Sequence, residues 1–254
     1  MKTSYSIAAA ILLVLSTAAL ADPRPFTFNT DTYPVGKGQG EYEQWVTYRH
    51  RTDEDNSYSR FDFRHEFEYG LADNFDIAVY FANWRYEQTN DGTRTHYDSS
   101  SLELVYYHPI GDIVDLGFYN EIGVGDGEVE FEQKLLVQKD VGQWTFTYNL
   151  IIETEIEGTF KKNADTEVEG VLAHSHGVSY TPPQVPGLHF GAEALVESIY
   201  EDWNEYEDTV YYAGPKFGYM SGNHWWFTVT PLFQLSSVDD EPQYLVRLIA
   251  GWEF

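Results

Sequence analysis

The sequence predicts an all-β fold, a closed antiparallel transmembrane β-barrel of about twelve strands joined as an up-and-down meander. One observation is the end of the chain, where residues 244–254 alternate between an apolar and a more polar face and Phe254 closes the apolar row. Another is that such period-two segments recur after residue 38, each followed by a turn. The third is the aromatic content of 17%, which suits the aromatic girdles of a barrel better than an average soluble core.

The N-terminus has the pattern of a signal peptide. Lys2 precedes an apolar run from Ile7 to Ala21 that ends in Ala-Leu-Ala. This run of about 15 residues is shorter than the roughly 20 that a spanning helix needs, so we expect residues 1–21 to be removed after Ala21. Lys2 is the only charged residue in that segment, so the net charge of -26 becomes -27 in the mature chain.

Composition narrows the function classes. The mean hydropathy of -0.42 is compatible with a barrel, because only alternate residues of each strand meet lipid. The absence of cysteine excludes a lipoprotein anchor, disulfides and cysteine-bound metals. The strongly acidic charge repels phosphates, so we expect no nucleic-acid partner.

Residues 22–38 are predicted as a periplasmic leader, because Pro23, Pro25 and Pro34 with Gly36 and Gly38 are unfavourable in a strand. The barrel is predicted over residues 39–254. Its strands are expected at residues 39–52, 58–70, 75–88, 97–108, 115–124, 128–140, 143–157, 168–181, 187–202, 208–221, 225–237 and 243–254. Boundaries of this kind carry an error of about two to four residues.

Each pair of strands is bounded by residues that favour turns. The first four strands are separated by the charged stretch 53–57, the short turn 71–74 and the polar loop 89–96. Gly-Asp-Gly at 125–127 forms the next tight turn, and three prolines at 182–186 forbid ladder pairing after the eighth strand. Long polar connections alternate with shorter ones, which with an even strand number places both chain ends on the periplasmic side.

The alternation also predicts which residues face inward. On strand 58–70, Phe61 and Phe67 share one face while Arg64 and Glu66 share the other. An Arg or Lys facing the middle of the bilayer costs roughly 2 to 4 kcal/mol, so the charged row belongs inside. The residues predicted to line the pore are Glu41, Glu43, Arg49, Asp62, Arg64, Glu66, Glu68, Glu103, Glu121, Glu130, Glu132, Lys134, Glu153, Glu155, Glu193, Glu197 and Arg247.

Carboxylates greatly outnumber cations in this inward set. Acidic rings favour cations in selective pores, so the first hypothesis is a passive channel with an acidic lumen for small cationic or neutral hydrophilic solutes. The alternative is a plugged barrel in which the four inward cations neutralise neighbouring carboxylates and nothing passes. Barrel size does not decide, because twelve strands lie between the filled eight-stranded and the open sixteen-stranded barrels.

Other chemistry is weakly indicated. His174 and His176 lie at i and i+2 and form half of a metal site, but no third ligand is identifiable and the orientations of strands 168–181 and 208–221 stay open. Ser175 points to the opposite face from both histidines, so they do not serve it as a base. We therefore predict no catalytic, cofactor-binding or metal residues. A non-conducting structural or adhesion barrel and an outer-membrane enzyme remain alternatives, and a soluble secreted β-protein is the third.

Three segments carry a family resemblance: Gly-Glu-Tyr-Glu-Gln-Trp at 40–45, Phe-Asp-Phe-Arg-His-Glu-Phe at 61–67 and the terminal Gly-Trp-Glu-Phe. With the signal peptide, they resemble a proteobacterial outer-membrane barrel family assigned as transporters, whose function is not established. The resemblance implies an outer-membrane location, contact with lipid and lipopolysaccharide, and assembly by the barrel-assembly machinery through the C-terminal strand. Twelve-stranded channels for acidic oligosaccharides are lined by arginine tracks, so the acidic inward set argues against an anionic cargo.

Overall fold

The computed structural model describes residues 24–161, 165–221 and 224–254. The predicted signal peptide lies outside these residues. The described chain forms fourteen strands: β1 (Gly40–His50), β2 (Ser59–Ala72), β3 (Phe75–Tyr80), β4 (Trp84–Thr89), β5 (Gly92–Tyr97), β6 (Ser99–Ile110), β7 (Val114–Gly125), β8 (Glu128–Val141), β9 (Trp144–Glu157), β10 (Glu167–Tyr180), β11 (Leu188–Glu201), β12 (Glu205–Met220), β13 (Trp225–Gln234) and β14 (Tyr244–Glu253).

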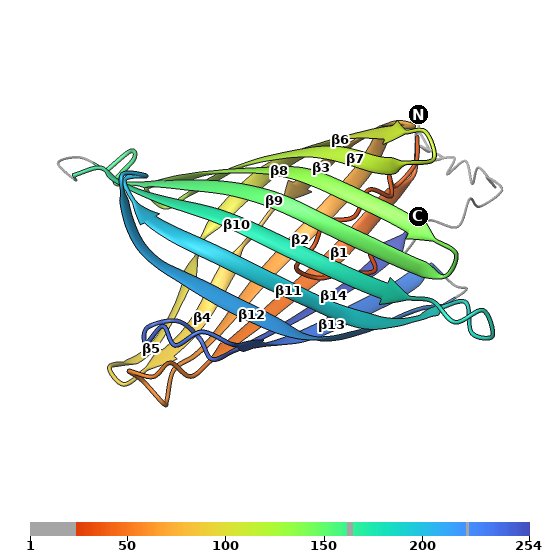
Figure 1. Ribbon diagram of the computed structural model, residues 1–254. Coiled ribbons are helices and arrows are strands. Elements are labelled where there is room, and N and C mark those ends of the chain that lie inside the picture. The colour runs from red at the N-terminus through yellow and green to blue at the C-terminus, as the bar shows by residue number, and fades with distance from the viewer. Residues whose placement is uncertain (1–23, 162–164, 222–223) are drawn as a thin grey trace, which may run out of the picture.

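The strands close into an antiparallel barrel. From β6 to β14 neighbouring strands pair in chain order around one sheet, and β1 pairs with both β2 and β14 (Figure 1). Closure between β1, β2 and β14 joins the two sides of the sheet, as a backbone surrounded by hydrocarbon requires. The predicted closed antiparallel barrel is confirmed.

Two barrel strands are interrupted, so fourteen elements make a wall of twelve strands. Both β3 and β4 pair with β2, at different positions along it, and β6 and β5 pair with them in turn. At the interruption, the Asn83 amide donates a 2.8 Å hydrogen bond to the Ser99 carbonyl, and the Asp98 amide donates one of 2.8 Å to the Asn83 carbonyl. The break therefore bends the wall without leaving these backbone groups unpaired.

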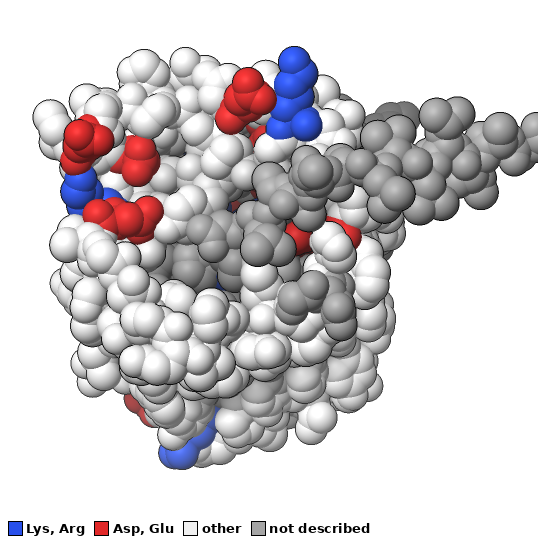
Figure 2. All heavy atoms as spheres, turned by 90° about the vertical axis from the view of Figure 1, so that its right-hand side faces the viewer, with Lys and Arg blue, Asp and Glu red and all other residues white. Residues whose placement is uncertain are grey.

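The chain enters and leaves the wall at the same end of the barrel. Gly40 and Phe254 exchange backbone hydrogen bonds of 3.0 and 2.9 Å. Figure 2 looks onto this end, where carboxylates outnumber cations among the visible charged side chains and most of the described surface is uncharged. We call it the turn end and the opposite end, which holds the 51–58 and 235–243 connections, the loop end.

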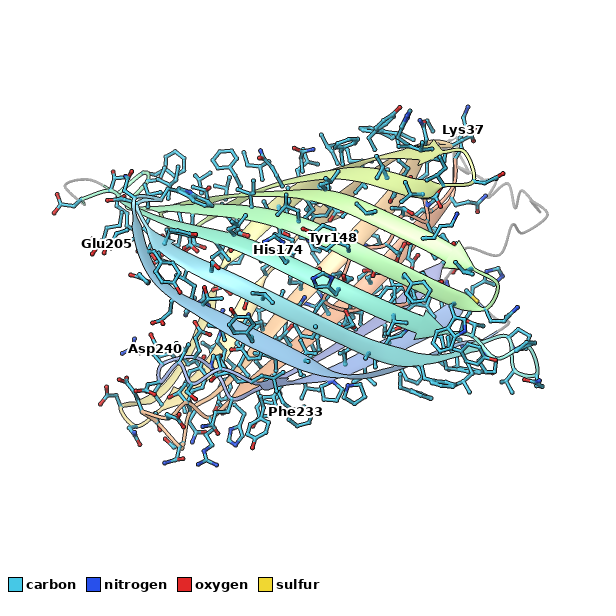
Figure 3. The ribbon with its side chains drawn as sticks, in the orientation of Figure 1. Lys37, Tyr148, His174, Glu205, Phe233 and Asp240 are labelled. Carbon is cyan, nitrogen blue, oxygen red and sulfur yellow. The ribbon has the colours of Figure 1, made fainter. Side chains whose placement is uncertain are left out.

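Side chains alternate between the interior and the outer face. In β7, Tyr119 and Glu121 are buried, whereas Phe118 and Ile122 are 46% and 40% exposed. The outer surface also changes along the barrel axis. In Figure 3, Phe233 and Tyr148 lie on the barrel wall, while Lys37, Glu205 and Asp240 lie toward its two ends. An apolar belt between charged ends is the outer surface that a bilayer requires.

The structure orients the two strands that the sequence leaves open. In β10, Ser175 and Ser179 are buried inside, so His174 lies on the outer face, where its Nδ1 is 2.8 Å from the Tyr148 hydroxyl (Figure 3). In β12, Lys216 is buried inside and Phe217 faces outward. Within the described ranges, no helix is long and apolar enough to cross a membrane.

Candidate functional site in the barrel interior

The interior holds all seventeen residues that the sequence assigns to the inward face. Most of them surround internal cavities or bind one another, as in the 2.5 Å ion pair between Arg64 and Glu121. Glu66 and Glu193 contact the segment before β1 instead. Whether these residues line an open path for solutes stays a prediction.

The leader lies inside the barrel. The sequence predicts residues 22–38 as a leader that begins in the periplasm and does not decide whether it enters the lumen. In the structure, residues 24–35 run through the interior, where Phe26 is fully buried and Asn29 is almost so (Figure 1). The physical reason is backbone satisfaction: a proline-rich segment has few ladder partners of its own, so its buried amides must bind side chains. We call residues 24–35 the plug.

Glu193 of β11 accepts more hydrogen bonds from the plug backbone than the other wall residues described below. Its carboxylate accepts backbone hydrogen bonds from Thr27 at 2.9 Å, Phe28 at 2.7 Å and Asn29 at 3.0 Å. The Thr230 hydroxyl of β13 donates a further bond of 2.5 Å to the same carboxylate. Successive amides converging on one carboxylate form an anion nest in the plug backbone, and hydrogen bonds to a charged acceptor are the strong class.

Other wall residues hold the rest of the plug. Asn149 of β9 binds both backbone groups of Thr30, accepting from its amide at 2.7 Å and donating to its carbonyl at 2.9 Å. Further along, the Thr32 amide donates to Gln138 and the Val35 amide to Asp76, each at 2.9 Å. Of these wall partners, Glu193 belongs to the inward set that the sequence predicts, whereas Asn149, Gln138 and Asp76 do not.

Small and apolar residues of the wall receive the two plug phenylalanines. A Cβ at Gly177 of β10 would lie 2.5 Å from the Phe26 ring, so only glycine leaves room for this ring. Phe28 packs in an interior apolar cluster with Leu195 and Leu232. Nearby, the Lys216 ammonium donates to the carbonyl of Pro25. The plug is thus fitted to this side of the wall by shape as well as by hydrogen bonds.

Arg24 at the start of the plug enters a group of glutamates. We call Glu41, Glu43, Glu66, Glu68 and Glu103 the carboxylate cup. Arg24 Nε is 2.8 Å from Glu43, and its Nη2 is 3.6 Å from Glu66 and 3.5 Å from Glu68. A hollow of about 30 Å³ remains beside Arg24, bordered by the other cup residues Glu41 and Glu103.

Carboxylates also stand directly opposite one another on neighbouring strands. One row runs through Glu103, Glu121, Glu132 and Glu153 across β6 to β9. A second row, nearer the loop end, runs through Glu130, Glu155, Glu169 and Glu201 across β8 to β11. Like charges directly opposite are destabilising, and ion pairs with Arg64 and Lys134 offset this repulsion for Glu121 and Glu132.

Several cations of the interior lie on the wall opposite these rows. A cavity of about 220 Å³ toward the loop end lies between Arg60, Arg85 and Arg247 on one side and Glu130 and Glu155 on the other. A second cavity, of about 240 Å³, borders the plug itself. On the turn-end side, a cavity of about 320 Å³ is bordered by Pro25 and His189. The plug therefore lies between hydrophilic cavities on its two sides.

The loop end is partly covered by the 235–243 connection. Val238 packs against the interior apolar cluster, and the Asp53 amide donates a 2.9 Å hydrogen bond to the Asp239 carbonyl. In the same loop, burial raises the pKa of Glu241, whose carboxylate accepts a 3.3 Å hydrogen bond from Tyr212. This loop narrows the mouth on the side opposite the plug.

Two groups of carboxylates in the described chain could hold a metal ion. Glu130, Glu132 and Glu153 form one, with oxygens within 4.8 Å of one another, and Glu128, Glu155 and Glu157 form the other. Lys134 already pairs with Glu132 at 2.5 Å. His174 and His176 belong to neither group. We assign no metal to these positions.

A closed antiparallel barrel with an apolar outer belt and a charged interior defines the class of outer-membrane β-barrels. The chain belongs to the family of unknown function DUF6662, whose model matches residues 117–244. No curated protein matches the chain.

Solved structures share the fold. The chain is similar to the COG4313 outer membrane channel from Pseudomonas putida F1, with 9% identity over 90% of this chain and 100% of that chain and a TM-score of 0.67. It is also similar to the translocator domain of the autotransporter NalP from Neisseria meningitidis, with 16% identity over 86% of this chain and 89% of that chain and a TM-score of 0.54. At these identities the likeness concerns the fold alone.

Proposed function

We propose that this protein is an outer-membrane channel that passively admits small cationic or neutral hydrophilic solutes and that the plug closes it until displaced. The observation that carries this proposal is the pairing of carboxylates in rows that face the interior cavities. Such rows cost stability, and rings of acidic side chains favour cations in pores. A function in cation passage accounts for them.

Conductance in planar bilayers tests this proposal. In a KCl gradient, the reversal potential of the purified protein is expected to have the sign of cation preference. The matched double variant Glu130→Gln, Glu153→Gln keeps side-chain size but removes two interior charges, so it should weaken that preference while retaining the heat-modifiable gel migration of a folded barrel. Anion preference in the unsubstituted protein would contradict the proposal.

One observation favours a second candidate, a non-conducting barrel with a structural or adhesive role. The amides of Thr27, Phe28 and Asn29 all donate to Glu193 of β11, and the Asn29 side chain accepts from Ser175 of β10. A permanent plug would make the barrel a rigid surface scaffold. Absence of current steps from the full chain and from a variant with a weakened plug anchor would favour this reading over the channel.

We also propose that the signal peptide is removed after Ala21 and that lipid and lipopolysaccharide surround the mature barrel. The barrel-assembly machinery would recognise the C-terminal strand, which ends in the exposed Trp252 and Phe254. Expressed with its full leader sequence, the protein is expected in the outer-membrane fraction with an intact mass that corresponds to residues 22–254. A retained N-terminus or recovery in the soluble fraction would refute this proposal.

A further inference from the structure

We infer that the carboxylate cup is a binding site for an organic cation of the guanidinium or ammonium class and that Arg24 is its tethered occupant. This inference rests on the proposed function, because it names the class of solute that the channel would recognise. Binding of a cation to the cup does not itself require conduction, so the binding inference and the proposed channel function can be refuted separately.

The cup contains the two elements that recognise an organic cation. Carboxylates of Glu43, Glu66 and Glu68 lie within 3.6 Å of the Arg24 guanidinium. The Trp45 ring lies beside it, with its centroid 5.2 Å from the guanidinium carbon, within the range of a cation–π contact. The Trp45 indole also donates a 2.7 Å hydrogen bond to Glu43, which fixes the ring and the carboxylate relative to each other.

Glu66 shows that Arg24 does not use the cup fully. Its side chain is completely buried beside the Glu43 carboxyl, and neither of its carboxylate oxygens accepts a hydrogen bond from a cationic donor within the described chain. The nearest cationic nitrogen, Arg24 Nη2, is at 3.6 Å, beyond hydrogen-bond distance. A buried acceptor left in this state costs free energy, and a free cation, which can take its own position in the cup, can supply the missing donor.

The charge of the cup points the same way. Glu41 stands directly opposite Glu68, and Glu43 directly opposite Glu66, on β1 and β2. Arg24 brings one positive charge to five carboxylates. Opposed like charges repel, so the cup attracts further positive charge, which a dication or a tightly seated monocation provides.

A solute can approach the cup from the loop side. Arg24 borders both the hollow between the cup glutamates and the cavity of about 240 Å³ beside the plug. A cation in this cavity therefore meets the position that Arg24 holds. A side chain tethered next to its site competes at an effective concentration of the order of millimolar, so Arg24 should mask the cup against dilute ligands.

Removing the tethered competitor tests the inference. Purified full-length Arg24→Ala, folded in detergent, is titrated calorimetrically with methylguanidinium and with its neutral analogue methylurea. We expect the variant to bind methylguanidinium roughly tenfold more tightly than the unsubstituted protein does, and to gain thermal stability from methylguanidinium but not from methylurea. Adding Glu66→Gln to Arg24→Ala should abolish most of this gain.

Three variants complete the test. Arg24→Gln keeps most of the side-chain length without the charge and should behave as Arg24→Ala, whereas Arg24→Lys should still mask the cup. Lys139→Ala removes one positive charge outside the interior, where the ammonium contacts the Asp112 carbonyl, and controls for net charge. Equal methylguanidinium affinity in the Arg24→Ala, Arg24→Gln and Lys139→Ala variants would overturn the assignment, even if the barrel conducts cations.

Discussion

The Glu193→Gln variant is expected to release the plug from the barrel wall. The substitution keeps the size of the side chain but turns one acceptor oxygen into an NH₂ group. This group faces either the Thr27 amide, which donates to Oε1, or the amides of Phe28 and Asn29, which donate to Oε2. Loss of the charged acceptor, together with the buried donors left unpaired, is expected to make the free energy of plug docking less favourable by about 3 to 4 kcal/mol. The ratio of docked to released plug should therefore fall by about two to three orders of magnitude.

Hydrogen exchange measures this release directly. In the unsubstituted protein the amides of residues 27–29 should be protected, and in Glu193→Gln their exchange should accelerate by a similar factor of roughly two to three orders of magnitude. Single-channel recordings of the same variant should show longer open periods. Unchanged protection of these three amides would show that Glu193 does not anchor the plug.

Two further variants separate plug release from general damage. Gly177→Leu places a side chain where the Phe26 ring lies, so it should release the plug by a route that leaves Glu193 intact. Glu197→Gln removes a carboxylate from the same strand and face as Glu193, at a position that borders the cavity. It should leave exchange at residues 27–29 close to that of the unsubstituted protein.

The strands and their faces were predictable because lipid imposes a local rule. Every second residue of a wall strand meets hydrocarbon, so the contrast between Phe67 and Glu66 can be recognised within a few positions. The inward glutamates of β8 and β9 follow from the same alternation. Their pairing into rows requires the register between strands, which the sequence alone does not specify.

The plug was not predictable, because its partners lie far away in the chain. Thr27 and Glu193 are separated by 166 positions, and the plug has no periodic pattern that would indicate a buried face. The open orientation of β10 comes from His174 and His176, which lie with apolar residues on the outer face and contact Tyr148. Gly177 and Lys216 face inward because they receive Phe26 and the Pro25 carbonyl, so their residue types reflect the plug rather than lipid or water.

A disulfide between the plug and the wall is expected to lock the barrel shut. Asn29 Oδ1 accepts a 3.0 Å hydrogen bond from the Ser175 hydroxyl of β10, so the Asn29→Cys, Ser175→Cys variant places two thiols on adjoining positions of plug and wall. The chain has no cysteine of its own, so this is the one disulfide that oxidation can form within a molecule, and peptide mapping by mass spectrometry distinguishes it from disulfides between molecules.

Oxidation should abolish current steps in planar bilayers, and reduction should restore them. A closed wall of strands paired with one another has little freedom to open, so the plug is the element whose displacement can create a path. The control pair Ser198→Cys, Thr209→Cys joins β11 to β12, where the two hydroxyls are 2.9 Å apart, and does not involve the plug. If the oxidised plug variant conducts as its reduced form does, solutes pass without plug displacement, and the closed state proposed for residues 24–35 is wrong.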